Sequence, residues 1–120
     1  MIGFTPSQRY YLSRQPADMR KSYDGLSGLV RQGLGRDPLS GEVFIFMNRR
    51  RTLVKLLVWD RSGFVLWSKR LERGTFELPR STAVGASIIL GWEELVLILE
   101  GVSLGSVRRR MRYSRVQAAA

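Results

Sequence analysis

Apolar residues recur along this chain with two different periods, and the changes of period predict where its helices and strands lie. A short strand is expected over residues 9–12, and helical spacing follows it. Asp18 is the expected N-cap of this first helix, and Gly33 is the glycine expected to end it. Two internal glycines, Gly25 and Gly28, weaken the helix, which indicates that they allow close packing onto a sheet. Its apolar positions are Met19, Tyr23, Leu26, Leu29 and Val30.

The middle of the chain predicts several strands in succession. Residues 43–47 are apolar at every position, which is typical of a central strand with both faces covered. Residues 53–59 follow the same pattern except for Lys55, and the side chains of residues 64–69 alternate between two faces. A further extended segment is expected over residues 75–78. Because short turns separate the strands, the prediction is an antiparallel β-meander.

Two turns join these strands. Residues 48–52 form an arginine-rich turn, and residues 60–63 form a tight hairpin turn in which Gly63 is expected to adopt a positive φ. Trp59 and Trp67 flank the second turn. We therefore expect the two indole rings to lie near one another, with at least one of them buried.

The pattern changes again in the last third of the chain. A short apolar strand is expected over residues 87–90, followed by a helix over residues 92–100 that Gly101 ends. Residues 107–120 predict a basic, weakly structured tail. The sequence thus predicts a single α+β domain over residues 1–106, built as an antiparallel β-meander with two flanking helices.

Composition narrows the classes of function that the chain can have. It contains 20 Lys and Arg against 10 Asp and Glu, a formal net charge of +10, and it has no Cys and no His. Thiol and imidazole chemistry, and metal sites built from those ligands, are therefore excluded. The four aspartates lie in a cap, a helix and two turns, and three glutamates belong to one helix, so no set of acids converges on an active site. We therefore expect no enzyme, no metal and no cofactor. This balance of charge favours binding of a polyanion, most often nucleic acid.

Hydropathy gives no indication of a membrane segment. The longest apolar runs, residues 43–47 and 95–99, fall far short of the ~20 residues that span a bilayer. Polar residues interrupt any amino-terminal signal pattern. We expect a protein without a membrane partner that is located in the cytoplasm.

Basic residues gather in the strand region, and they are the expected nucleic-acid-binding residues. Between residues 49 and 73 they alternate with aromatic residues, which suits phosphate contacts and base stacking; a solvated basic surface is the alternative interpretation. Arg20 and Lys21 add two cations to the expected first turn of the first helix, where backbone N–H groups bind phosphate. The alternative for this pair is a salt bridge to Asp24 or to Glu42. The expected binding residues are Arg20, Lys21, Arg49, Arg50, Arg51, Lys55, Lys69, Arg70 and Arg73.

The tail carries a second group of basic residues, with no acidic residue after Glu100. Basic arms commonly bind nucleic acid by tracking its backbone, and the alternative is a solubilising tail. The arginines of this group are Arg108, Arg109, Arg110, Arg112 and Arg115.

Several ordered motifs of the chain resemble one known family. They are Asp-Met-Arg-Lys-Ser-Tyr-Asp-Gly-Leu at residues 18–26, Asp-Pro-Leu-Ser-Gly at 37–41, Phe-Ile-Phe-Met-Asn-Arg-Arg-Arg at 44–51, Lys-Leu-Leu-Val-Trp-Asp at 55–60 and Lys-Arg-Leu-Glu-Arg-Gly at 69–74. In these motifs the chain is similar to the small TnpB accessory protein of the bacterial insertion-sequence family numbered sixty-six, which is distinct from the larger RNA-guided nuclease of the same name. The resemblance implies a protein encoded beside the element's transposase that assists transposition and has no established catalytic activity.

Charge and resemblance together lead to one functional hypothesis and one alternative. The hypothesis is a non-catalytic DNA-binding accessory protein of transposition, anchored by residues 49–51 and extended by residues 69–73. The alternative is a protein–protein adaptor that recruits or stabilises the transposase through residues 18–21, without direct contact with DNA. The expected partners are DNA and the transposase, and the sequence gives no indication of oligomeric state.

Overall fold

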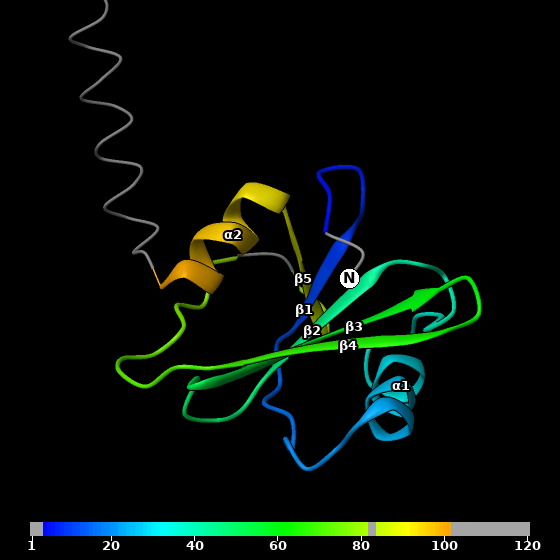
Figure 1. Cartoon of the computed structure of the whole chain (residues 1–120), viewed down its shortest axis with the longest axis horizontal. Coiled ribbons are helices and arrows are strands. Elements are labelled where there is room, and N and C mark those ends of the chain that lie inside the picture. The colour runs from blue at the N-terminus through cyan, green and yellow to red at the C-terminus, as the bar shows by residue number, and fades with distance from the viewer. Residues whose placement is uncertain (1–3, 82–83, 102–120) are drawn as a thin grey trace, which may run out of the picture.

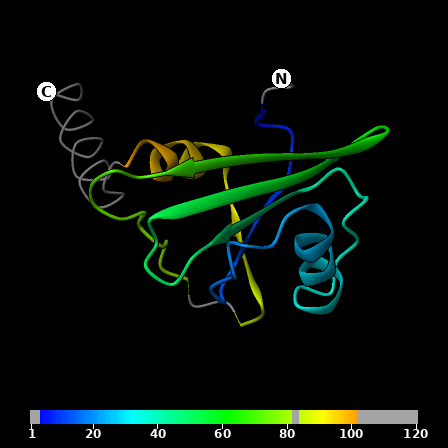
Figure 2. The same ribbon diagram turned by 60° about the horizontal axis from the view of Figure 1, so that its bottom comes forward.

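The computed structural model describes residues 4–81 and 84–101, which form one five-stranded sheet with a helix on each face (Figures 1 and 2). The strands lie in the order β4-β3-β2-β1-β5. Within the described residues, no helix is long and apolar enough to cross a bilayer. The elements are β1 (Tyr10–Ser13), α1 (Tyr23–Gln32), β2 (Val43–Met47), β3 (Leu53–Asp60), β4 (Gly63–Arg70), β5 (Ser87–Leu90) and α2 (Trp92–Glu100).

The sheet is mixed, so the predicted α+β class is confirmed but the predicted meander is only part of it. Strands β2, β3 and β4 are consecutive antiparallel neighbours, as expected. Strand β1, however, pairs with β2 in parallel, and β5 returns to pair with the other edge of β1 in antiparallel fashion. The cause lies in the connection from β1 to β2, which contains α1 and is long enough to cross over one face of the sheet.

Alternating side chains give the sheet two separate apolar cores, one under each helix (Figure 2). Every residue of β2 is buried because its odd and even positions face different helices, which confirms the predicted central strand. The buried core on the α2 side consists of Tyr10, Leu12, Val43, Ile45, Met47, Val54, Leu56, Val58, Phe76, Leu90, Leu95 and Ile98. The buried core on the α1 side consists of Tyr11, Leu26, Val30, Phe44, Phe46 and Leu57.

Helix α1 begins later than the sequence predicted. Its N-cap is Ser22, not Asp18, whose carboxylate instead closes a turn by accepting a hydrogen bond from the backbone N–H of Arg20 at 3.0 Å. The two internal glycines do not bring the helix close to the sheet. A Cβ at Gly28 would meet no atom within 4 Å, and the atoms nearest to a Cβ at Gly25 belong to the Lys21 side chain, at 3.0 Å, and not to the sheet. The packing role predicted for them was therefore wrong.

The turn between β3 and β4 also differs from its prediction. The residue with positive φ is Arg61, at 53°, not Gly63. Trp59 lies across from Phe64 on the α1 side, with ring centroids 5.1 Å apart, whereas Trp67 lies across from Leu56 and packs on the α2 side. The two indoles therefore occupy opposite faces of the sheet, and both are only half-buried, so the expected pairing was wrong.

Residues 75–78 form no strand and do not join the sheet, so the prediction that they extend the meander was wrong. Phe76 nevertheless anchors this segment, because its ring is fully buried in the core on the α2 side. Helix α2 ends as predicted at Gly101, which adopts a left-handed conformation with φ of 75°. The tail predicted over residues 107–120 lies outside the described residues.

Candidate nucleic-acid interface

The arginine-rich turn between β2 and β3 is held in shape by the side chain of Asn48. The Asn48 carboxamide oxygen accepts hydrogen bonds from the backbone N–H of Thr52 at 2.8 Å and of Leu53 at 3.1 Å. The Asn48 amide nitrogen donates to the Thr52 hydroxyl at 3.0 Å. Because the Asn48 side chain supplies the hydrogen bonds that stabilise the turn, the arginine side chains between Asn48 and Thr52 are not needed to hold it together.

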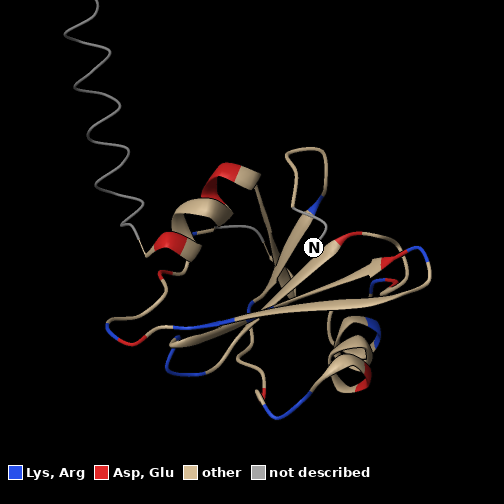
Figure 3. Cartoon of the chain, viewed as in Figure 1, with Lys and Arg blue, Asp and Glu red and all other residues tan. Residues whose placement is uncertain are grey.

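The same turn is fastened to the segment that follows β4. The backbone N–H of Leu71 donates to the carbonyl of Thr52 at 2.8 Å, and the N–H of Phe76 donates to the carbonyl of Arg51 at 2.7 Å. Since Arg70 lies opposite Leu53 in the sheet register, residues 70–76 run beside the turn. Figure 3 shows the resulting concentration of basic residues at one end of the sheet.

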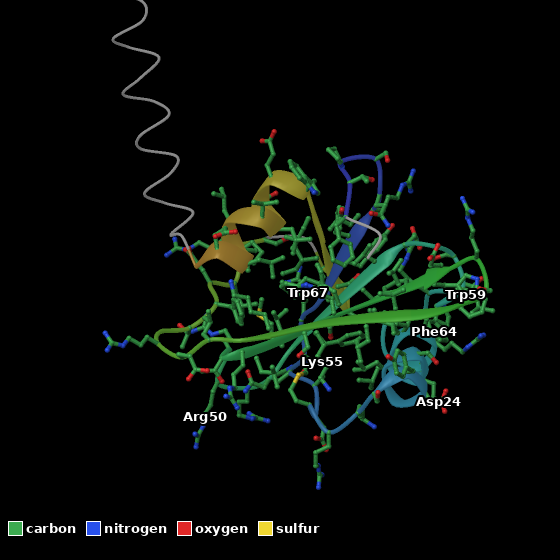
Figure 4. All side chains as sticks on the ribbon, viewed as in Figure 1. Asp24, Arg50, Lys55, Trp59, Phe64 and Trp67 are labelled. Carbon is green, nitrogen blue, oxygen red and sulfur yellow. The ribbon has the colours of Figure 1, made fainter. Side chains whose placement is uncertain are left out.

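The side chains of this basic end differ in exposure and in partners. Arg49 and Arg50 are exposed and Arg51 is half-buried, and within residues 4–81 and 84–101 none of the three forms an ion pair (Figure 4 labels Arg50). Arg73 is exposed as well. Arg70 pairs with Glu72 at 3.3 Å, but both side chains are largely exposed, so this bond is weak.

Two of the three lysines among the expected binding residues, Lys55 and Lys69, bond to backbone carbonyls. The Lys55 ammonium donates to the carbonyl of Met19 at 2.8 Å and to that of Lys21 at 3.0 Å, which ties the loop before α1 to β3. The Lys69 ammonium donates to the carbonyl of Leu99 at 2.7 Å, at the carboxyl end of α2, where the helix dipole favours a cation. Each lysine therefore has a structural task that its sequence context does not reveal.

Arg20 and Lys21 lie on the loop before α1. The prediction that they occupy the first helical turn was wrong, because α1 begins at Tyr23. The Arg20 guanidinium pairs with Asp18 at 2.7 Å, which is neither of the acidic partners expected from the sequence. Hydrogen bonds from Arg20 lower the pKa of the Asp18 carboxyl to about 2. This loop therefore combines both signs of charge.

The aromatic residues expected to interleave with the basic ones are not available beside the turn. Phe76 is fully buried, and Trp67 packs into the core on the α2 side. Trp59 and Phe64 pair with each other at the far end of the sheet (Figure 4). The basic end therefore presents guanidinium groups without a stacking platform.

Arg14 lies beside the basic end, although the sequence did not single it out. It follows β1 directly, and because β1 and β2 are parallel, it lies at the same edge of the sheet as Arg49. Arg14, Arg49 and Arg51 line one pocket. The parallel pairing of β1 with β2 brings Arg14 to this position, and no periodicity in the sequence reveals that pairing. Within the described residues, no group of three acidic side chains could hold a metal ion.

Comparison with known proteins gives the family of this chain. Residues 8–109 match the model of the family described as IS66 Orf2 like protein. The chain is 33% identical over 110 residues to the uncharacterized protein y4jC of Sinorhizobium fredii, with 92% of each chain covered. It is 31% identical over 116 residues to the uncharacterized protein y4hO of the same organism, with 97% of this chain and 99% of the relative covered. No solved structure matches the chain. Since the family match takes in all five strands and both helices, the chain belongs to the IS66 Orf2-like family of accessory proteins associated with transposition.

Proposed function

We propose that this protein is a non-catalytic DNA-binding accessory factor of transposition, and that it holds the phosphate backbone with the basic end of its sheet. The basic end consists of the turn arginines Arg49, Arg50 and Arg51 with the neighbouring Arg70 and Arg73. The observation that carries the proposal is the turn itself. Its shape is maintained by Asn48 and by backbone bonds from residues 71 and 76, which leaves its guanidinium groups for a ligand.

Guanidinium groups without an aromatic platform favour backbone contact over base recognition. Arginine forms bidentate hydrogen bonds with phosphate oxygens and keeps its charge at any relevant pH. Contacts to phosphate position a protein on DNA but carry no sequence information. We therefore expect binding that depends strongly on salt and weakly on sequence.

The first test is a titration of fluorescent duplexes at several salt concentrations. If the five arginines of the basic end each neutralise one phosphate, log K falls against log salt with a slope of about −4 to −5. A duplex with the sequence of the element's end and a random duplex should give similar slopes.

Replacing Arg49, Arg50 and Arg51 together by Ala should reduce the magnitude of this slope by up to about three units. The matched control replaces Arg9, Arg31 and Arg61 by Ala, which removes the same charge from exposed side chains elsewhere. Both variants should stay folded, since surface substitutions typically change the free energy of unfolding by no more than about 0.5 kcal/mol each. Only the turn variant should lose most of its affinity.

Other outcomes would reject the proposal in distinct ways. Equal losses in both triple variants would mean that net charge alone drives binding. Retention of DNA binding by the turn variant, together with loss of the transposase in a pull-down, would make the turn a protein interface. A slope near zero for the unmodified protein would exclude DNA as the ligand.

A further inference from the structure

A pocket of about 110 Å³ opens at the carboxyl ends of β1 and β2. Its lining includes Ser13 and Arg14 from the end of β1, Asn48, Arg49 and Arg51 from the turn after β2, and Leu78 from the segment after β4. The pocket lies where the parallel pair of the described sheet ends. In open α/β sheets this edge, outside the carboxyl ends of parallel strands, is where ligands commonly bind.

Three arginines line this small pocket, so positive charge is concentrated around it. Like charges held close together repel each other, and an anion between them removes that cost. Arg49 and Arg51 have no ion-pair partner within the described part of the chain. Arg14 is oriented by its neighbours, because its backbone N–H donates to the carbonyl of Ala86 at 3.0 Å and its guanidinium donates to the Ser81 hydroxyl at 3.4 Å.

The backbone at Arg51 gives a second, independent reason to assign its side chain a binding task. Arg51 has a φ of 58°, a conformation that glycine or asparagine adopts at much lower cost than arginine. Nothing in the turn needs the guanidinium, since Asn48 and Phe76 already bond to the turn backbone. Arg61 shares this conformation without lining the pocket, so a positive φ alone assigns no function. At Arg51 it coincides with a position on the pocket, and the two observations together point to its side chain.

We propose that this pocket binds one phosphate group, held by Arg14, Arg49 and Arg51. Its volume is that of about three or four water molecules, which a tetrahedral phosphate with four oxygens can fill. The proposal rests on the proposed function and deepens it, because it assigns a binding site beside the basic end to one phosphate of the DNA strand. That phosphate is either an internal phosphodiester, with two non-bridging oxygens, or a terminal 5′-phosphate, with three, and both present anionic oxygens that arginine can bind.

The chemistry of the pocket is tested without DNA, by titrating the isotope-labelled full chain with inorganic phosphate and following its NMR spectrum. A parallel titration with sodium chloride at equal ionic strength controls for screening. Phosphate, but not chloride, should shift the backbone amide signals of Ser13, Asn48, Arg49 and Arg51. Absence of phosphate-specific shifts at these residues would overturn the proposal whether or not the protein binds DNA.

Arg51→Gly is the most informative variant, and Arg61→Gly is its matched control. Both residues are arginines with positive φ in hairpin turns, at 58° and 53°, but Arg61 lies at the other end of β3. Glycine suits both backbones, so both variants should melt at or a few degrees above the temperature of the unmodified protein. Arg51→Gly should weaken phosphate binding about tenfold, and Arg61→Gly should leave it unchanged.

Arg49→Gln serves as a second pocket variant, because Arg49 is exposed and its removal leaves the turn intact. It should also weaken phosphate binding. Phosphate affinity that is unchanged in both Arg51→Gly and Arg49→Gln would overturn the assignment of the pocket.

Two duplexes of one sequence, with 5′-phosphate or 5′-hydroxyl ends, distinguish the sources of the phosphate. If a terminal phosphate occupies the pocket, the phosphorylated duplex binds more tightly, and Arg51→Gly abolishes the difference. If an internal phosphate occupies it, Arg51→Gly weakens binding of both duplexes equally. A further outcome is that phosphate shifts the NMR signals of the pocket residues while neither duplex binds. That result would confirm the phosphate site but reject both DNA as the source of the phosphate and the proposed function.

Discussion

Lys55 and the turn arginines carry the same charge but differ in their hydrogen-bond partners. Lys55 has a structural role, whereas Arg50 is exposed to solvent. The Lys55 ammonium is shared between the carbonyls of Met19 and Lys21, so it holds a loop in place. Arg50 is exposed, and no ion pair involves it in the described part of the chain. A count of charges in the sequence treats both residues alike, because the partner of a long side chain depends on which loop the fold brings to it.

Lys55→Met is therefore expected to act on folding rather than on binding. The substitution keeps an aliphatic stem but leaves two carbonyls without their charged donor, which should lower the free energy of unfolding by about 2 kcal/mol. DNA affinity of the folded variant should stay within about twofold of the unmodified protein. Urea denaturation and duplex titration measure the two effects.

Arg50→Met is the reciprocal control for Lys55→Met. Here methionine replaces an exposed cation at the basic end. The free energy of unfolding should therefore change by less than about 0.5 kcal/mol, while DNA affinity falls. If Lys55→Met instead weakened DNA binding at unchanged stability, Lys55 would belong to the interface after all.

At the scale of elements, the sequence predicted the individual helices and strands better than their arrangement. The strands at residues 43–47, 53–60 and 63–70 follow from apolar runs and tight turns, which are local features. The parallel pairing of β1 with β2 depends on a crossover by α1, and no periodicity within β1 distinguishes a parallel neighbour from an antiparallel one. The position of Arg14 in the pocket was missed for this same reason.

The connection from α1 to β2 contains an ion pair between Arg36 and Glu42, which predicts that the stability of the fold depends on pH. The Arg36 guanidinium pairs with Glu42 at 3.0 Å and lies 4.0 Å from the centre of the Tyr11 ring. Burial alone raises the pKa of the Glu42 carboxyl, but hydrogen bonds from Arg36, Ser40 and Tyr11 lower the pKa by more, so the net shift is downward. Glu42 therefore stabilises the fold fully above its unfolded pKa of about 4.5, and this contribution disappears as the pH falls through its folded pKa.

Glu42→Gln isolates this contribution. At pH 7 the variant should be less stable by about 1 kcal/mol, a modest value because the Arg36 side chain is one-third exposed. The difference in free energy of unfolding between the two proteins should shrink as the pH is lowered from 5 to 3. Asp18 titrates in both proteins and cancels from the comparison. A difference that stays constant from pH 7 to pH 3 would mean that Glu42 acts through packing and not through its charge.

At the scale of the whole molecule, charge is distributed unevenly around the sheet. Helix α2 carries Glu93, Glu94 and Glu100 and no basic residue, whereas the arginines of the basic end gather at one edge of the sheet (Figure 3). A polyanion approaching the protein is therefore attracted to the basic end and repelled by the exposed side of α2. The net charge of +10 could be calculated from the sequence, but this polarity could not, because it depends on where α2 folds back.

The division of the chain into a domain over residues 1–106 and a tail remains a prediction, and truncation tests it. All buried core residues of the described part lie between Tyr10 and Ile98, and α2 is already closed at Gly101. A chain ending at residue 106 loses five arginines and no acid, which lowers its formal net charge from +10 to +5. It should keep its free energy of unfolding within about 0.5 kcal/mol.

The truncated chain also shows whether the basic end and the tail act independently on DNA. Effects of distant sites add when the sites share no partner, so the triple substitution of Arg49, Arg50 and Arg51 should reduce the salt slope by the same amount in the full and truncated chains. If the tail also contacts phosphates, truncation should itself reduce the magnitude of the salt slope. The reduction caused by the triple substitution should nevertheless be the same in both chains. Unfolding of the truncated chain would refute the domain boundary. If the triple substitution had no effect on the salt slope of the truncated chain, the turn arginines would bind DNA only together with the tail. The proposed interface would then have to include both.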